Sequence, residues 1–216
     1  MEINGMTLLK TPYIEKKPSS LRYYQEGVPN IDVDAWTLNI TSLTGNSVKL
    51  DRSALLALPQ FTHHRRMVCV CNWSIKRYWQ GVLLEDVLTK ARIDTQATAN
   101  TFLKQTSVGT TDKGVYESWI RLDEALERSA ILAHSVDGEP LPLEQGYPLR
   151  LIDFGLYGYK NVKGLTSIEV VDQWQLGHWE RIAGYALDGT VKPKRYWAVD
   201  LKSHQFTQNK GEVTDW

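Results

Sequence analysis

The sequence predicts an α+β fold, a single domain of mixed β-sheets with flanking helices, on three observations. The length of 216 residues suits one sizeable core better than two independent domains. Several segments alternate apolar and polar residues with the period of a half-buried strand. Other segments space their apolar residues as an amphipathic helix does. We expect an extended, polar lead-in over residues 1–20 and the domain itself over residues 21–216.

The first strand pair is expected near residue 40. Apolar and polar residues alternate over residues 36–40, and the turn sequence Thr-Gly-Asn follows at residues 44–46. Residues 48–50 begin the return strand. A short helix comes next, and either Asp51 or Ser53 can cap it.

Both cysteines of the chain lie at the end of one apolar run. Residues 67–70 read as a strand that follows a basic cluster, and Asn72 is a turn-favouring residue before a tryptophan-rich segment. The strand therefore delivers the thiol of Cys69 or Cys71 to the edge of a loop. Three interpretations of these cysteines remain open at this point, namely small hydrophobes in a core, a strained disulfide across two residues, and half of a zinc site.

The middle of the chain predicts further helices and strands. Residues 81–92 have the spacing of an amphipathic helix, whereas strands are expected at residues 99–107 and 115–120. A helix capped by Asp123 is expected to run into the apolar residues 130–132.

The last third of the chain is rich in glycine, proline and aromatic residues. Residues 136–172 interleave Gly and Pro with Leu and Ile, which favours a turn-rich wall of strands beside a ligand, closed by a strand over residues 167–171. The aromatic residues beyond Trp174 show no clear period, so no element is predicted there.

Composition excludes several classes of partner. Lys and Arg number 25 and Asp and Glu number 25, so the chain has no long-range attraction for nucleic acid or anionic membranes. No apolar run reaches the length of a membrane span, and the first residues lack the pattern of a secretory signal. We therefore expect a cytoplasmic protein, and two cysteines cannot form a disulfide framework.

The usual catalytic signatures are absent, including the Walker loop, the dinucleotide fingerprint, the Gly-x-Ser-x-Gly elbow and His-Glu-x-x-His. Two loops could instead converge, the cysteine loop and residues 157–163. In the second loop, glycines allow close backbone approach and Lys160 and Lys163 can neutralise a phosphate. An ordinary solvated turn would account for the same lysines.

Three blocks occur in order within residues 21–171 and carry a resemblance. In the first, Cys69 precedes Asn-Trp-Ser at residues 72–74; the second, residues 137–151, ends in a Gly-x-Pro-x-Arg pattern; the third is YGYKNVKGLTSIEV at residues 157–170. Together they resemble the sulfite oxidase and protein-methionine-sulfoxide reductase catalytic subunit family. The resemblance implies the sulfite-oxidase molybdopterin-binding fold.

The resemblance also implies a cofactor, Mo-molybdopterin. It makes the Cys69 thiolate the molybdenum ligand, while the pyranopterin dithiolene supplies two further sulfurs; soft sulfur donors suit this metal, and Arg65 and Arg66 would favour the thiolate. Tyr185 is the second implied catalytic residue. The implied cofactor contacts are Tyr24, Gln25, Asn72, Lys104, Gln145, Arg150, Lys160, Asn161, Val162 and Lys163.

In this interpretation the phosphate end of the cofactor meets a cationic nest. Arg150 is the planar donor, with Lys160, Lys163 and the backbone amides of Asn161 and Val162 around it. By resemblance, Gln145 occupies the place of a family residue that contacts the cofactor.

The implied reaction is oxygen-atom transfer to or from a small-molecule substrate such as a sulfoxide, an N-oxide, sulfite or a similar oxyanion. Sulfite is disfavoured because residues 22–25 read Arg-Tyr-Tyr-Gln where sulfite oxidases carry Arg-Asn-His. We expect an external electron-transfer partner, which would be a haem, flavin or quinone-linked protein. Two alternatives are a non-catalytic molybdopterin carrier and a metal-free protein-interaction module.

Overall fold

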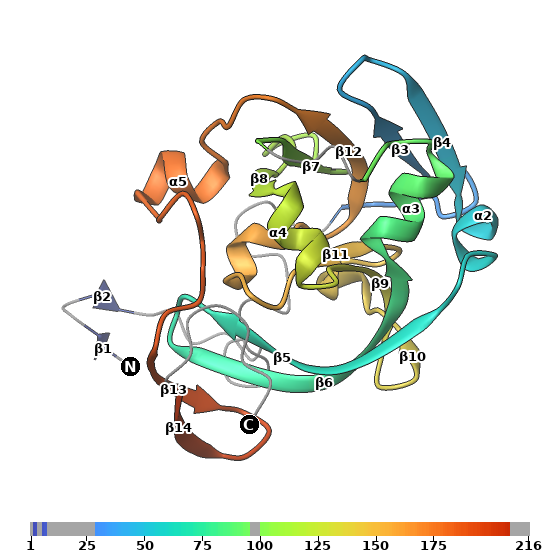
Figure 1. The fold of residues 1–216 in the computed structure, drawn as a ribbon. Helices are drawn as coiled ribbons and strands as arrows, with labels where there is room; N and C mark the ends of the chain where they lie inside the picture. Colours follow the sequence, from blue (N-terminus) through green and yellow to red (C-terminus); the bar gives the residue numbers. More distant parts are fainter. Residues whose placement is uncertain (1, 4–5, 8–28, 96–99, 208–216) are drawn as a thin grey trace.

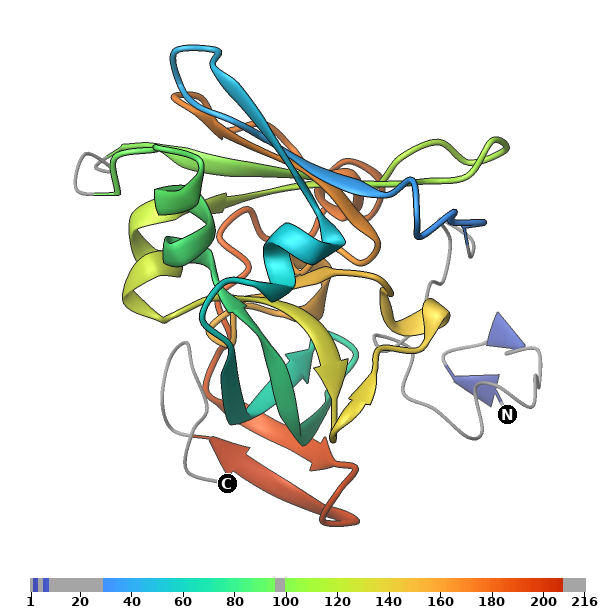
Figure 2. The ribbon, with the colours of Figure 1, turned by 90° about the vertical axis from the view of Figure 1, so that its right-hand side faces the viewer.

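The computed structural model describes residues 2–3, 6–7, 29–95 and 100–207, and its main body consists of two β-sheets. In Figure 2 the five-stranded sheet lies across one side, β5, β6 and β9 lie on the other, and the β13–β14 hairpin projects at the far end. The predicted α+β fold of mixed sheets with flanking helices is confirmed. The predicted lead-in over residues 1–20 falls almost entirely outside the described residues.

The five-stranded sheet has the order β4-β3-β12-β7-β8 (Figure 1). β12 runs parallel to β3 and antiparallel to β7, so the sheet is mixed. Its strands are β3 (Thr37–Thr41), β4 (Ser47–Asp51), β7 (Phe102–Ser107), β8 (Glu117–Arg121) and β12 (Leu165–Val171).

The seven-stranded sheet has the path β10-β9-β6-β13-β14, with β5 paired to β6 and β11 paired to β9. β13 is parallel to β6, whereas the other pairs of this sheet are antiparallel. Its strands are β5 (Phe61–Cys69), β6 (Trp73–Leu83), β9 (Ile131–Val136), β10 (Glu139–Pro140), β11 (Arg150–Ile152), β13 (Lys194–Ala198) and β14 (Ser203–Thr207). A further pair, β1 (Glu2–Ile3) and β2 (Met6–Thr7), lies near the N-terminus.

Short helices connect and cover the strands. They are α2 (Arg52–Leu56), α3 (Leu84–Lys90), α4 (Leu122–Glu127), α5 (His178–Ala183) and the 3₁₀ turns η2 (Leu143–Gln145) and η3 (Gly158–Lys160). Within the described ranges no helix is long and apolar enough to cross a membrane. The largest apolar core joins α3 and α4 to both sheets and includes Leu38, Val87 and Leu103.

Several predicted elements are confirmed. β3, its turn and β4 occur as expected, and the Asp51 side chain caps α2 by accepting a hydrogen bond from the Ala54 amide at 2.7 Å. α3 lies inside the predicted helix at residues 81–92 and buries Val87 and Leu88. Here local pattern and tertiary packing agree, which is why the sequence was informative.

Other predictions at the element level were wrong or incomplete. The helix predicted to run into residues 130–132 ends at Glu127, and residues 131–132 are instead the first two residues of β9, which pairs with β6 and β11. Arg121 rather than Asp123 is the N-cap residue of α4; the Asp123 carboxylate instead pairs with the Arg121 guanidinium at 2.6 Å. β6, β13 and β14 were not predicted, because continuous or irregular apolar runs do not distinguish a buried strand from a loop.

Candidate functional site

The two cysteines lie at the tip of the hairpin formed by β5 and β6. Cys69 pairs with Trp73 across the hairpin, and the Asn72 amide donates to the Cys69 carbonyl at 3.1 Å. Asn72 has a φ of 69°, the left-handed conformation that a three-residue hairpin loop requires at its last position and that asparagine tolerates. The sequence prediction that a strand delivers a thiol to a loop edge is confirmed.

The cysteine sulfurs have different surroundings. Cys69 is 5% exposed, whereas Cys71 is exposed, and neither takes part in a disulfide. The Cys71 amide donates a hydrogen bond to the Cys69 sulfur at 3.4 Å. This contact fixes the position of the Cys69 sulfur relative to the hairpin loop. The described part of the chain holds no cluster of three or more His, Cys, Asp or Glu suited to a metal ion.

The arginines predicted to favour the Cys69 thiolate have other partners. The Arg66 guanidinium is buried and binds both carboxylate oxygens of Asp200 at 2.7 Å. The Arg65 guanidinium lies 4.3 Å from the Phe154 ring centroid and donates to the Arg128 carbonyl at 2.9 Å. Both guanidinium groups therefore also help to hold the fold together, and the Cys71 amide is the donor that contacts the Cys69 sulfur directly.

The loop of residues 157–163 lies beside the cysteine strand, as predicted. Tyr157 forms a parallel bridge with Val68 of β5, the residue directly before Cys69. The Tyr157 hydroxyl also hydrogen-bonds to the Tyr196 hydroxyl at 2.7 Å, which ties the loop to β13. The two loops that the sequence singled out therefore converge.

Arg150 and Lys163 are the cations of the candidate site, and Gly146 packs against both of them. The Arg150 guanidinium is buried; it donates to the Gln145 carbonyl at 2.9 Å and to the Met67 sulfur at 3.7 Å. Gly146 has a φ of 111°, and a Cβ there would lie 3.0 Å from Lys163 Cβ and 3.1 Å from Arg150 Cβ. Met67 lies two residues before Cys69 on the same face of β5. Its contact with Arg150 therefore connects Arg150, Lys163 and Gly146 to the strand that carries Cys69.

Lys160 requires a correction. Its ammonium is buried, forms an ion pair with Glu180 and donates to the Trp119 carbonyl at 3.1 Å. Its aliphatic chain fills the space beside Gly189. Lys160 thus holds η3 against α5, and this placement does not favour the predicted contact with a phosphate.

The backbone amides predicted to complete the nest also have internal partners. The Val162 amide donates to the Gln105 side chain at 3.3 Å, and the Asn161 amide donates to the Gly158 carbonyl at 3.2 Å. The Asn161 side chain accepts from the Asp153 amide at 3.0 Å. These groups shape the loop, so the cationic nest reduces to Arg150 and Lys163.

Lys104 lies away from the other predicted contacts. It follows a buried residue and precedes Gln105, which faces the 157–163 loop, so alternation along β7 places Lys104 on the opposite face. Its ammonium pairs with Glu117 and Glu169 at 3.2 Å each. Burial alone would lower the pKa of Lys104, but the hydrogen bonds that its ammonium donates to these carboxylates raise it. The predicted contacts Tyr24 and Gln25 lie outside the described residues.

Tyr185 lies within electrostatic range of both cysteines. Burial raises the pKa of its hydroxyl, and negative charge on the Cys71 and Cys69 sulfurs raises it further. Its ring packs against Tyr159 at a centroid distance of 5.0 Å and stacks on Trp179 at 5.6 Å. The family resemblance implied a catalytic role for Tyr185, whereas the sequence assigned no role to Tyr159 or Trp179, since their clustering around Tyr185 depends on tertiary packing.

Comparisons with known proteins place this arrangement in a family. The model of the oxidoreductase molybdopterin-binding domain matches residues 25–179. The chain belongs to this family, and the predicted class, a molybdopterin-dependent oxidoreductase with Mo-molybdopterin as cofactor, is confirmed.

Individual relatives agree with the family. The chain is 34% identical over 171 residues to the protein-methionine-sulfoxide reductase catalytic subunit MsrP of Gluconobacter oxydans, covering 74% of this chain and 55% of the relative. It is 31% identical over 162 residues to the uncharacterized oxidoreductase YuiH of Bacillus subtilis, covering 73% of this chain and 76% of the relative. The chain therefore spans only about half the length of the first relative.

A solved structure supports the fold. The sulfane dehydrogenase SoxCD of Paracoccus pantotrophus aligns with a TM-score of 0.60 and 17% identity, over 84% of this chain and 47% of that chain. At this identity the comparison supports the fold alone.

Proposed function

We propose that this chain reduces a small sulfoxide by oxygen-atom transfer, with molybdopterin bound between the Cys69 hairpin tip and the loop around Lys163. The observation that carries the proposal is the convergence of a sulfur that accepts a backbone N–H with the cationic group of Arg150 and Lys163. Methionine sulfoxide is the favoured substrate, because the relative of Gluconobacter oxydans is named for it.

The residues present suit the cofactor that the family implies. Cys69 offers the soft sulfur donor that molybdenum prefers. The Asn72 side-chain oxygen is buried and has no hydrogen-bond partner among the described residues, so it is available to a bound group. Arg150 and Lys163 would meet the phosphate, and the absence of a Cβ at Gly146 leaves room between them.

The cofactor supplies the two-electron redox chemistry, and the protein supplies ligation, orientation and a proton. Reduction of a sulfoxide consumes two electrons and two protons and yields a thioether and water. Because the pKa of Tyr185 is raised, its hydroxyl stays protonated at neutral pH and can donate to the substrate oxygen. The aromatic wall of Tyr159 and Trp179 would hold the apolar part of a thioether substrate.

The remaining parts of the proposal concern partners and location. We expect an electron donor of the haem, flavin or quinone-linked type and a cytoplasmic location for the chain. These follow from the family resemblance and from the sequence pattern, respectively.

Substitution Cys69→Ser tests the proposal, with protein made in a host that synthesises the cofactor. We expect molybdenum content, measured by elemental analysis, to fall several-fold and methionine sulfoxide reduction with a reduced dye to be lost, because a hydroxyl is a poor donor to this metal. Cys71→Ser is the matched control and should retain the metal.

Two results would contradict the proposal. Unchanged molybdenum and unchanged turnover in the Cys69→Ser variant would favour a molybdopterin carrier. Wild-type protein without molybdenum, from a host that makes the cofactor, would favour a metal-free interaction module.

A further inference from the structure

Four strands place a row of side chains between Cys69 and the surface. Cys69 of β5 pairs with Trp73 of β6, Trp73 pairs with Trp197 of β13, and Trp197 pairs with His204 of β14. Residues paired in this way share one face of the sheet. Neighbouring strands lie about 4.8 Å apart, so roughly 10 Å separates the backbones of Cys69 and Trp197. Trp73 is 9% exposed and Trp197 is 38% exposed, so the row runs from the buried sulfur to solvent.

The surface end of this row is the exposed face of the β13–β14 hairpin. We call Arg195, Trp197, His204 and Phe206 the hairpin face, since cross-strand pairing and alternation put them on one side. Phe206 is 61% exposed, and the Trp197 and His204 rings meet edge to face with centroids 5.1 Å apart. Two large exposed aromatic side chains beside a guanidinium have the composition of a protein-binding hot spot.

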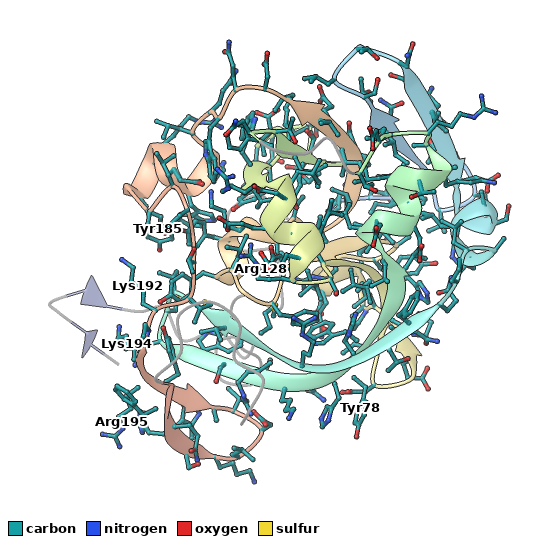
Figure 3. All side chains as sticks on the ribbon, in the orientation of Figure 1. Tyr78, Arg128, Tyr185, Lys192, Lys194 and Arg195 are labelled. Atoms are coloured by element: carbon teal, nitrogen blue, oxygen red, sulfur yellow. The ribbon has the colours of Figure 1, made fainter. Side chains whose placement is uncertain are left out.

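The surroundings of the hairpin face are basic, although the formal net charge of the whole chain is +0. Residues 190–207 contain four Lys and Arg residues and one acidic residue, Asp200, which pairs with the buried Arg66. The four basic side chains are all exposed: Lys192, Lys194, Arg195 and Lys202. Figure 3 shows Lys192, Lys194 and Arg195 one below another along the flank that leads into β13, below Tyr185.

We propose that the hairpin face and its basic rim of Lys192, Lys194 and Lys202 dock the electron donor, which is an acidic redox protein. The inference rests on the proposed function and adds where the partner binds and what charge it carries. Charge complementarity speeds the encounter, and the exposed aromatic side chains supply the contact that is desolvated on binding.

The location suits electron delivery. The partner is the reductant: it gives up the two electrons that sulfoxide reduction consumes, while the two protons come from solvent, one of them through the Tyr185 hydroxyl. Trp73 and Trp197 lie on adjacent strands between the docked partner and Cys69. Neither tryptophan is oxidised or reduced in the reaction. If Trp197 and His204 faced the opposite side of the sheet, they would not continue the row that starts at Cys69 and Trp73.

The test measures binding of a defined probe, an acidic flavodoxin, to the full chain by isothermal titration calorimetry at low and high ionic strength. The double substitution Lys194→Glu and Arg195→Glu should weaken binding roughly tenfold or more at low ionic strength, because it places like charges across the interface. The matched control, Lys49→Glu and Lys90→Glu, makes the same change of net charge at exposed positions outside the hairpin and should leave binding unchanged. Phe206→Ala should weaken binding at both ionic strengths.

Turnover adds a second measurement. Flavodoxin-driven sulfoxide reduction should fall in the Lys194→Glu, Arg195→Glu variant, whereas dye-driven reduction should match the wild type. If both double variants bind flavodoxin equally well, the docking site is wrong. It is also wrong if the hairpin-face variant differs from the wild type in oligomeric state on size-exclusion chromatography, because the face would then bind a second copy of the chain. If the wild type shows no dye-driven sulfoxide reduction, the proposed function is wrong. The calorimetric binding measurement would still test the docking site.

Discussion

Arg150, Lys160 and Lys163 carry the same charge but lie in different environments. The Lys160 ammonium is fully buried against Glu180, Arg150 is buried beside Met67, and Lys163 is half-buried beside Gly146. An ammonium removed from water costs several kcal/mol unless it is paired. Lys160 is therefore a structural cation, which leaves Arg150 and Lys163 as the proposed contacts of an anion.

The sequence singled out Cys69, Gly146 and Arg150 as site residues because motif spacing constrains the backbone there, and the structure places Arg150 beside Gly146 and against Met67 of the cysteine strand. Spacing alone could not show that Lys104 faces away from the 157–163 loop, because the face that a strand residue occupies depends on the alternation and pairing of the whole strand. The sequence misassigned Lys160 because the direction of a side chain in a turn depends on what packs against it, here Glu180 from a helix 20 residues away. Residue type and spacing alone do not contain that information.

Tyr185→Phe tests the proton donor. We expect kcat for methionine sulfoxide reduction to fall about 100-fold, the lower end of general acid contributions, with molybdenum content unchanged. The wild-type rate should decline only as pH rises above 10, because the pKa of Tyr185 is raised from its ordinary value of 10.0 and the donor is lost through that pKa. A variant that retains the wild-type rate and the same alkaline decline would exclude Tyr185 as the donor.

At the scale of elements, buried ion pairs fasten the C-terminal third to the sheets. Lys160 of η3 forms an ion pair with Glu180 of α5, and Arg66 of β5 forms an ion pair with Asp200 in the β13–β14 turn. Neither pair could be predicted, since its members are far apart in the sequence and the segment beyond Trp174 has no period. β6 and β9, by contrast, were missed because consecutive residues on both of their faces are buried, so apolar and polar residues do not alternate along them.

Lys160→Met is expected to destabilise the fold by about 3–5 kcal/mol, because the Glu180 carboxylate stays buried without its cation. Replacing both residues, Lys160→Met with Glu180→Leu, should recover most of the loss, since an apolar pair of similar volume carries no charge to desolvate. Urea unfolding of the wild type and the two variants measures this. A double variant as unstable as the single one would show that the pair is not the source of the cost.

Asp200→Asn is expected to destabilise the β13–β14 hairpin by about 2–3 kcal/mol at neutral pH, less than for a fully buried pair because the Asp200 side chain is 24% exposed. Burial alone would raise the pKa of Asp200, but the hydrogen bonds and charge of Arg66 lower it below 3.8. A lowered carboxyl pKa stabilises the fold above pH 3.8, and this contribution is lost as pH falls through the folded-state pKa.

The difference in unfolding free energy between the wild type and the Asp200→Asn variant should therefore be full at neutral pH and shrink below pH 3.8. Chemical unfolding at several pH values measures it. A difference that stays constant into acid would mean that the carboxylate charge is not what stabilises the hairpin.

At the scale of the whole molecule, the loop of residues 157–163 joins the two sheets. Gln105 of the five-stranded sheet bonds to the Lys160 carbonyl at 3.0 Å and the Val162 amide at 3.3 Å, while Tyr157 pairs with Val68 of the seven-stranded sheet. The predicted mixed-sheet fold was confirmed, but this junction depends on strand order, which the sequence did not specify. A group bound between Cys69 and Lys163 would contact both sheets through one loop.

Cofactor loading should therefore stabilise the whole molecule and not only the hairpin tip. A ligand present at about 100 times its Kd adds roughly 2.7 kcal/mol to a folded state that alone binds it. In a chain of this size that corresponds to a rise in Tm of roughly 5–10 °C. Calorimetry would compare wild-type protein from hosts with and without cofactor synthesis, and the Cys69→Ser variant from the first host should unfold near the cofactor-free Tm. We expect a single transition that moves as a unit, whereas a five-stranded sheet that unfolds at the cofactor-free Tm, before the seven-stranded sheet, would place the cofactor on the seven-stranded sheet alone.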